Sequence, residues 1–216
     1  MAGRPASGGL RSIATHKSNV SRRSAKAWQN RRMDTALPTM GHLFWRWIEL
    51  YGLDAKALFQ RQGFTIQDIQ SHGERIAIDR MERIILEALG LIEDKCSGLN
   101  ASRCWHPSDL GALGYAWLAS STINSALRRM ERYSGIVGEK SNVTVQDTAK
   151  GLKVSFQQKP RPPLVRDLIA DFIMSITLDM CRFSFGASLR PIEVSLERAQ
   201  PDCAERYLEF YGCNLC

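Results

Sequence analysis

The side chains best suited to bind a metal ion are the six cysteines and four histidines of this 216-residue chain. Cys213 and Cys216 have the C-x-x-C spacing of a zinc-ligand pair, but a structural zinc site needs a second pair, and the sequence provides none. Cys104 and His106 form another candidate metal pair, in a loop, and they also lack further ligands. We therefore expect no metal site, and we expect cysteines that are reduced and mostly buried.

The sequence has none of the motifs that position groups for common enzyme reactions. It lacks a glycine-rich phosphate loop, an H-E-x-x-H pair, a G-x-S-x-G turn and an EF-hand loop. Its histidines are scattered, and no periodicity places two acidic side chains in one cleft, although general acid–base catalysis requires such positioned groups. We expect a protein that is not an enzyme and that uses no cofactor.

The remaining candidates are aromatic and arginine side chains in the stretch 110–137. Tyr115, Trp117 and Tyr133 combine apolar rings with polar tips, and Arg129 is able to pair with a carboxylate. This set of side chains suits a pocket that binds a ligand rather than one that transforms it. We predict that Tyr115, Trp117, Arg129 and Tyr133 bind a ligand, with the alternative that the three aromatic residues are core residues.

Helical periodicity dominates the first half of the chain. Trp47 falls on an apolar helix face and is expected in the core, whereas Trp45 points elsewhere and suits a pocket or a partner. Asp79 and Glu82 have capping-box spacing at the start of an amphipathic helix. The helices expected here are Thr39 to Gly52, Ala55 to Gln62 with Asp54 as its cap, Asp79 to about Lys95, and one that follows Ser121 or Thr122.

The second half mixes strand and helix patterns. Alternating apolar residues from Val143 to Phe156 predict a β-hairpin with a loop of about five residues, 147–151. A long, broadly apolar helix then starts near Pro163. A strand over 191–196, a helix after Pro201 and the start of an unpaired strand at 213–216 are expected to follow. Because strands and helices do not alternate regularly, the fold class is α+β, with helices packed on a small antiparallel sheet.

The net charge of +7 is concentrated at the N-terminus. Residues 1–33 contain no acidic residue, and their eight basic residues are Arg4, Arg11, Lys17, Arg22, Arg23, Lys26, Arg31 and Arg32. We predict a disordered basic tail over 1–35 and a nearly neutral folded domain over 36–216. The alternatives are a true start at Met33 or Met40, an organellar transit peptide, or a segment that weakly contacts phosphate groups. No apolar run is long enough to span a membrane and no secretory signal is recognisable, so a cytoplasmic protein is expected.

The stretch "LGALGYAWLASSTINSALRRMERYSGIV" resembles the signature of the N-terminal regulatory domain in one branch of the AraC-type transcription regulators. Its matching features are Gly111-x-x-Gly114-Tyr115, Ser121-Thr122, Ala126-Leu127 and Tyr133. Three further stretches, "YGLDAKALFQRQGF", "ERIAIDRMERII" and "PIEVSLERAQPDCAERYLEFYGCNL", resemble the same domain in order and spacing. The resemblance covers residues 40–216.

The resemblance implies a bacterial, cytoplasmic module that senses a small-molecule effector and dimerises. In the family this module precedes a DNA-binding domain of two helix-turn-helix motifs. The family label refers to arabinose, but the helix-rich pattern lacks the many short strands of a sugar-binding jelly roll, so the sugar is not carried over. Because the chain ends at Cys216, we expect a truncated regulator without specific DNA binding, which pairs with itself or with a full-length relative. The alternative is a stand-alone interaction protein whose basic tail contacts nucleic acid.

Overall fold

The computed structural model describes residues 33–65, 67–68, 74–213 and 215–216. The basic tail therefore lies almost wholly outside the described residues, and its predicted disorder and nucleic-acid contact stay predictions. Residues 34–216 form one compact unit, which is the subject of the following paragraphs.

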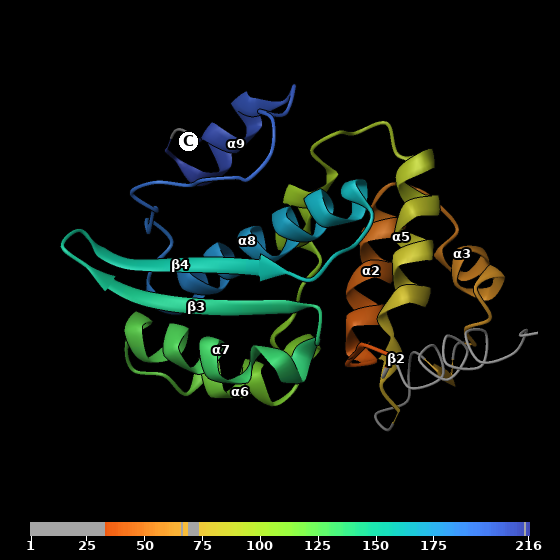
Figure 1. The fold of residues 1–216 in the computed structure, drawn as a ribbon, viewed down its shortest axis with the longest axis horizontal. Coiled ribbons are helices and arrows are strands. Elements are labelled where there is room, and N and C mark those ends of the chain that lie inside the picture. Colours follow the sequence, from red (N-terminus) through yellow and green to blue (C-terminus); the bar gives the residue numbers. More distant parts are fainter. Residues whose placement is uncertain (1–32, 66, 69–73, 214) are drawn as a thin grey trace, which may run out of the picture. The chain divides into compact units, whose positions relative to one another are not determined.

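The first part of this unit is helical, as expected (Figure 1). Trp47 is fully buried on α2, and Gly52 has the left-handed φ of +71° that ends this helix. The Asp54 carboxylate accepts a hydrogen bond from the backbone N–H of Ala57 at 2.9 Å, which confirms it as the cap of α3. The elements in this part are β1 (Thr35–Ala36), α2 (Thr39–Leu50), α3 (Ala55–Arg61), β2 (Ile76–Ala77) and α5 (Ile78–Leu91), and β1 pairs with β2 in antiparallel orientation.

The predicted capping box at Asp79 and Glu82 is wrong. Helix α5 begins at Ile78, directly after β2, and its N-cap is Ala77, which has an extended backbone and no capping side chain. Because the chain enters the helix before Asp79, both acidic side chains lie within the first turns and reach a distant partner. That partner is Lys140, whose Nζ lies 2.7 Å from Asp79 and 3.1 Å from Glu82.

The middle of the chain packs its short helices closely. Thr122 accepts a hydrogen bond from the Ser125 N–H at 3.1 Å, which confirms Thr122 as the cap of α7. A Cβ atom at Gly114 would lie 1.9 Å from the carbonyl oxygen of Pro107, so only glycine fits there. The elements in this part are the 3-10 helices η1 (Ser97–Arg103) and η2 (Pro107–Leu110), followed by α6 (Ala112–Leu118) and α7 (Ile123–Val137).

A β-hairpin lies beside α7, with strands β3 (Ser141–Thr148) and β4 (Gly151–Gln158) (Figure 1). Thr148 pairs with Gly151, so the turn contains two residues rather than the predicted five. The Thr148 hydroxyl donates to the Gly151 carbonyl at 2.8 Å and accepts from the Lys150 N–H at 3.3 Å, which stabilises the tighter turn. The strands therefore extend to the tip of the hairpin.

Helix α8 (Pro163–Phe185) is the long apolar helix that the sequence predicts, and buried side chains occur along most of its length. The chain ends with α9 (Ala204–Tyr211), which Gly212 terminates in the left-handed conformation. The predicted strand over 191–196 is reduced to one parallel bridge between Val194 and Leu215. The last residues do find a partner, contrary to the expectation, because the Cys216 N–H donates to the Val194 carbonyl at 2.9 Å.

The expectation of reduced cysteines is wrong for two of the six. Cys96, just before η1, and Cys203, at the start of α9, form a disulfide with their Cα atoms 6.3 Å apart. The pairing joins residues that are 107 positions apart, and no local sequence pattern signals it. Cys104 and Cys181 are buried and free, as expected.

The apolar side chains form two buried groups. The larger group is shared by α2, α3, α5, α6, α7, the hairpin and α8, and the smaller one surrounds Tyr207 and Tyr211 of α9. The class is α+β, with two small two-stranded antiparallel sheets in place of the single sheet expected. None of the helices in the described part of the chain is both long and apolar enough to cross a membrane.

Candidate functional site

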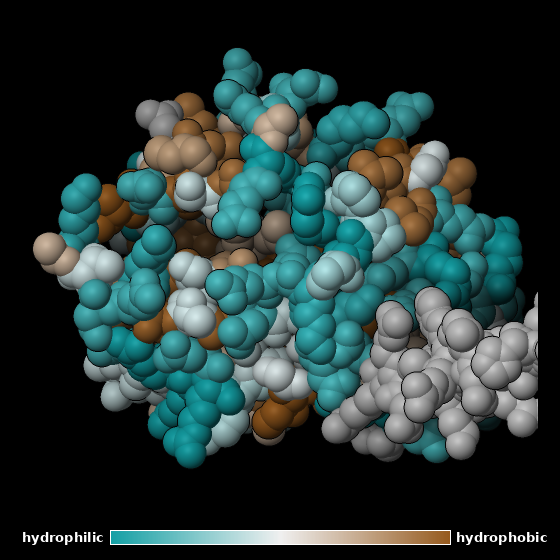
Figure 2. Space-filling view, in the orientation of Figure 1, coloured by the Kyte–Doolittle hydropathy of each residue, from teal (hydrophilic) through white to brown (hydrophobic). Residues whose placement is uncertain are grey.

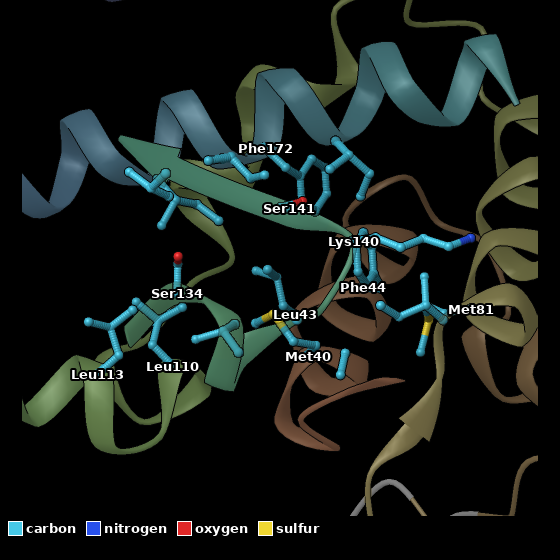
Figure 3. Close-up of a pocket in the computed structure, with 18 of the residues that line it drawn as sticks. Met40, Leu43, Phe44, Met81, Leu110, Leu113, Ser134, Lys140, Ser141 and Phe172 are labelled. Atoms are coloured by element: carbon cyan, nitrogen blue, oxygen red, sulfur yellow. The ribbon is translucent and has the colours of Figure 1, made fainter. Parts of the chain in front are cut away.

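A cavity of about 170 Å³ lies inside the larger core. Its wall comes from β1, α2, β2, α5, η2, α6, α7, β3 and α8, so it lies where most elements of the unit meet (Figure 3). Most of the wall is apolar, with Met40, Leu43, Phe44, Met81 and Phe172 among its residues. The face of the protein in Figure 2 is mostly hydrophilic, and its apolar side chains occur in small groups. The cavity, by contrast, has a mostly apolar wall.

The cavity wall includes three charged side chains, Glu82, Lys140 and Arg161. Their side chains are 8%, 11% and 4% exposed, respectively. Lys140 Nζ lies 3.1 Å from both carboxylate oxygens of Glu82, and Arg161 Nη1 lies 3.6 Å from one of them. We call these three residues the charged cluster.

The two cations of the charged cluster are held in different ways. Burial acts to lower the pKa of Lys140, but its hydrogen bonds with Asp79 and Glu82 together outweigh this effect and raise the pKa. Burial lowers the pKa of Arg161, because desolvation disfavours its charge more than Glu82 and Asp34 favour it. Lys140 is therefore well compensated, and Arg161 is not.

Polar side chains without charge also reach the cavity. The Ser134 hydroxyl of α7 points into it (Figure 3). Thr177 of α8 lines it as well, although its hydroxyl donates to the Ile173 carbonyl at 2.6 Å. An apolar cavity with a few polar groups is the usual form of a small-molecule site.

Two of the predicted ligand-binding residues, Tyr115 and Trp117, lie on α6 and do not line this cavity. Trp117 is buried, and its indole N–H donates to the Ser184 hydroxyl at 3.1 Å, so its polar tip already has a partner. Tyr115 is 65% exposed on the surface. Leu113, on the same helix, does line the cavity.

The other two predicted residues lie on α7. Arg129 Nη1 donates to the Ala116 carbonyl at 2.6 Å and to the Ser120 hydroxyl at 2.9 Å, which ties α7 to the end of α6. Tyr133 is half-buried against the core, with the guanidinium of Arg132 5.4 Å from its ring centroid. None of the four predicted residues lines the cavity, and their role in ligand binding stays a prediction. Met130, Ser134 and Val137 are the α7 residues that line it.

Sequence reasoning missed the charged cluster. Glu82 looked like a helix cap, Lys140 stands between a helix and a hairpin, and Arg161 lies in a proline-rich segment. Each looks like an ordinary surface charge when considered alone. The one available signal was Glu82, because it follows the apolar Met81 and precedes the apolar Ile84 and Ile85 on a strongly amphipathic helix.

The candidate metal pair is engaged in other contacts. His106 Nδ1 accepts from the Ser108 N–H at 3.3 Å and caps η2, while Cys104 is buried. Within the described ranges, no group of three or more His, Cys, Asp or Glu side chains is placed to hold a metal ion.

Comparisons with known proteins point to transcription regulators. Residues 52–216 match the family model of the arabinose-binding domain of AraC transcription regulators, N-terminal. No curated protein matches the chain. The fold is similar to the crystal structure of the transcriptional regulator CdpR from Pseudomonas aeruginosa, with a TM-score of 0.53 and 16% sequence identity. The likeness covers 81% of this chain and 51% of that protein, so the match spans about half of the length of CdpR.

Proposed function

The chain belongs to the family of the N-terminal arabinose-binding domain of AraC transcription regulators, and we propose that it senses a small-molecule effector in the cavity of its larger core. It is thus a regulatory domain of a transcription regulator. Self-association and cooperation with a DNA-binding domain are further properties that we carry over from the family as proposals.

The observation that carries this proposal is the cavity itself. It is surrounded by apolar side chains from nine elements, and it has a charged cluster in its wall. Tightly packed interiors contain few spaces of this size, and a cavity at the meeting point of so many elements suits a regulatory site. A ligand that contacts all of them favours one arrangement of these elements over another, and this preference is the physical basis of a regulatory response.

The lining does not favour a pentose as the effector. A sugar carries hydroxyl groups on most of its carbons, and each buried hydroxyl needs a hydrogen-bond partner. Outside the charged cluster, most of the wall consists of Leu, Ile, Val, Met and Phe side chains, which offer none. We therefore propose an effector that is mainly apolar.

A substitution that fills the cavity tests the proposed site. Ser134 points into the cavity, so Ser134→Phe places an aromatic ring where the ligand would lie. Ser188→Phe is the matched control, because Ser188 is exposed and lies outside the cavity wall. The unfolding temperature of each protein is measured with toluene, benzamide, benzoate, hexanoate and L-arabinose.

We expect at least one apolar compound to raise the unfolding temperature of the wild-type protein and of Ser188→Phe, by about 5–10 °C when the compound is at a hundredfold excess over its Kd. Ser134→Phe should lose this response, and L-arabinose should have no effect on any of the proteins. If no compound stabilises the wild type, or if Ser134→Phe responds as strongly as the wild type, the cavity is not the effector site.

A further inference from the structure

We propose that the effector is a small apolar monocarboxylate, whose carboxylate binds Arg161 and whose apolar part fills the cavity. This inference rests on the proposed function, because it specifies the ligand of the same site.

Arg161 is buried without a close carboxylate. Its side chain is 4% exposed, and its nearest carboxylate oxygen, on Glu82, is 3.6 Å away. Its Nη2 donates to the Lys140 carbonyl at 3.2 Å and lies 3.5 Å from the Ser141 hydroxyl. Its Nε has no hydrogen-bond partner among the described residues. A buried guanidinium normally makes short bonds to a carboxylate, so Arg161 has unused capacity to bind an anion.

The charged cluster has an excess of positive charge, and this excess lies at Arg161. Glu82 is the only carboxylate in the wall of the cavity as described, and Lys140 contacts both of its oxygens. Asp79 also contacts Lys140, but its side chain is 62% exposed, and Asp34 forms an ion pair with Lys159. The buried part of the cluster therefore has two positive charges and one negative charge. One further negative charge, as on a monocarboxylate, would balance it.

An unpaired Nε is not sufficient to indicate a ligand, because Arg198 has one as well. Arg198, however, makes bonds of 2.8 and 3.0 Å to both oxygens of Asp171 and one of 2.6 Å to the Tyr207 hydroxyl. Arg198 also does not line the cavity. Arg161 differs in both respects, since it lines the apolar cavity and has no short bond to a carboxylate.

The size and lining of the cavity restrict the rest of the ligand. A cavity of about 150 Å³ in a protein core accommodates benzene, so one of about 170 Å³ suits a ligand of roughly six to ten non-hydrogen atoms. A phosphate ester would bring about two negative charges and three strongly hydrated oxygens, which exceeds one unbalanced positive charge. Aromatic or short aliphatic acids such as benzoate and hexanoate match both the space and the charge.

Isothermal titration calorimetry of the full chain at pH 7 tests this inference, with benzoate and its uncharged analogue benzamide as probes. We expect wild-type protein to bind benzoate at least about tenfold more tightly than benzamide. Arg161→Met should remove this preference, while benzamide affinity changes by less than about threefold. Arg166→Met is the control, because Arg166 is half-exposed and pairs with its neighbour Asp167.

Glu82→Gln gives a test that does not depend on weakened binding. It removes the carboxylate that competes for Arg161, so benzoate affinity should increase by about three- to tenfold, with benzamide unaffected. A gain of affinity cannot arise from a misfolded protein.

The outcomes separate the two proposals. If toluene or benzamide binds and Ser134→Phe abolishes this binding, but benzoate has no advantage, the cavity is a ligand site and the carboxylate inference is overturned. If the benzoate preference persists in Arg161→Met, the carboxylate binds elsewhere and the inference is also overturned. If no probe binds the wild type, both this inference and the proposed effector site fail.

Discussion

Arg198, beside α9, and Arg161, beside the cavity, both have largely buried side chains that lie near a buried carboxylate. Around Arg198 the polar groups are closely matched: Asp171 accepts two hydrogen bonds from Arg198 and one of 2.7 Å from the Tyr207 hydroxyl. Gly98 packs so tightly on this group that a Cβ atom there would lie 2.5 Å from the Cβ of Asp171. Among the described residues, Arg161 has longer contacts, of 3.2 Å to a backbone carbonyl, 3.5 Å to a hydroxyl and 3.6 Å to Glu82, and it lines the cavity.

The balance of charge around each arginine distinguishes a structural ion pair from a group that is available to bind a ligand. The Asp171–Arg198–Tyr207 cluster is electrically balanced, so it needs no further ligand. Even there burial raises the pKa of Asp171, although Arg198 and Tyr207 act in the opposite direction, which indicates how costly an isolated buried charge is. The cluster of Arg161 is unbalanced, and in the proposal above a carboxylate bound in the adjacent cavity supplies the missing negative charge.

The strongest test of the comparison is Asp171→Ala. It leaves Arg198 buried without its carboxylate, so we expect the free energy of unfolding in urea to fall by about 3–5 kcal/mol. Asp167→Ala is the control on the same helix, since Asp167 is more exposed and pairs with Arg166 at the surface. A loss below about 1 kcal/mol for Asp171→Ala would mean that this cluster is no better matched than that of Arg161.

The second prediction concerns the Cys96–Cys203 disulfide, which joins η1 and α9 on the Arg198 side of the molecule. Replacing both cysteines by serine should lower the free energy of unfolding by about 2–5 kcal/mol, because the bridge closes a long loop of the unfolded chain. Benzoate or benzamide binding should change little, since neither cysteine lines the cavity. Cys216→Ser is the control, as Cys216 is free and exposed. If the double substitution weakens the free energy of ligand binding as much as the free energy of unfolding, the two regions are not separable.

A smaller effect is expected at the two tyrosines of α9. The Tyr207 hydroxyl donates to Asp171 and accepts from Arg198, so Tyr207→Phe should cost about 1–3 kcal/mol. The Tyr211 hydroxyl is buried and has no hydrogen-bond partner among the described residues, so Tyr211→Phe should be neutral or slightly stabilising. Urea unfolding of the two variants compares the same chemical change on one helix. A similar cost for both would argue against the bonding described for Arg198.

The sequence predicted the helical part of the fold well, because its signals there are local. Asp54, Gly52 and Thr122 act on residues within one turn of themselves, and each helix boundary that they mark is found. The tight turn at Thr148 and the early start of α5 were missed, because the first depends on a side-chain contact across the turn and the second on the pairing of β2.

Long-range pairings explain why the candidate site was not predicted. Glu82 contacts Lys140, which is 58 residues away in the sequence. The charged cluster forms only when three distant segments come together: α5, the segment that precedes β3, and the proline-rich segment after β4. The disulfide has the same character. The aromatic residues Tyr115 and Trp117 were prominent in the sequence, but one is exposed and the other has its own hydrogen-bond partner in the fold.

The smallest expected effect lies in the charged cluster. Lys140→Met should lower the free energy of unfolding at pH 8 by about 1 kcal/mol, because Arg161 remains beside Glu82 and balances its charge, and because Asp79 is well exposed and solvent screens its interaction with Lys140. The pKa of Lys140 is raised in the folded protein, so the charged form stabilises the fold at every pH below the pKa of the unfolded chain, about 10.4. As the pH rises through the folded pKa, Lys140 loses its charge and this contribution disappears.

The difference in free energy of unfolding between wild type and Lys140→Met is measured by urea unfolding. It should be constant from pH 8 to about pH 10 and shrink above it, whereas tyrosine ionisation affects both proteins and cancels. A difference that grows with pH would contradict the ion pairs with Asp79 and Glu82, and with them the assignment of Arg161 as the cation of the cluster without a short bond to a carboxylate.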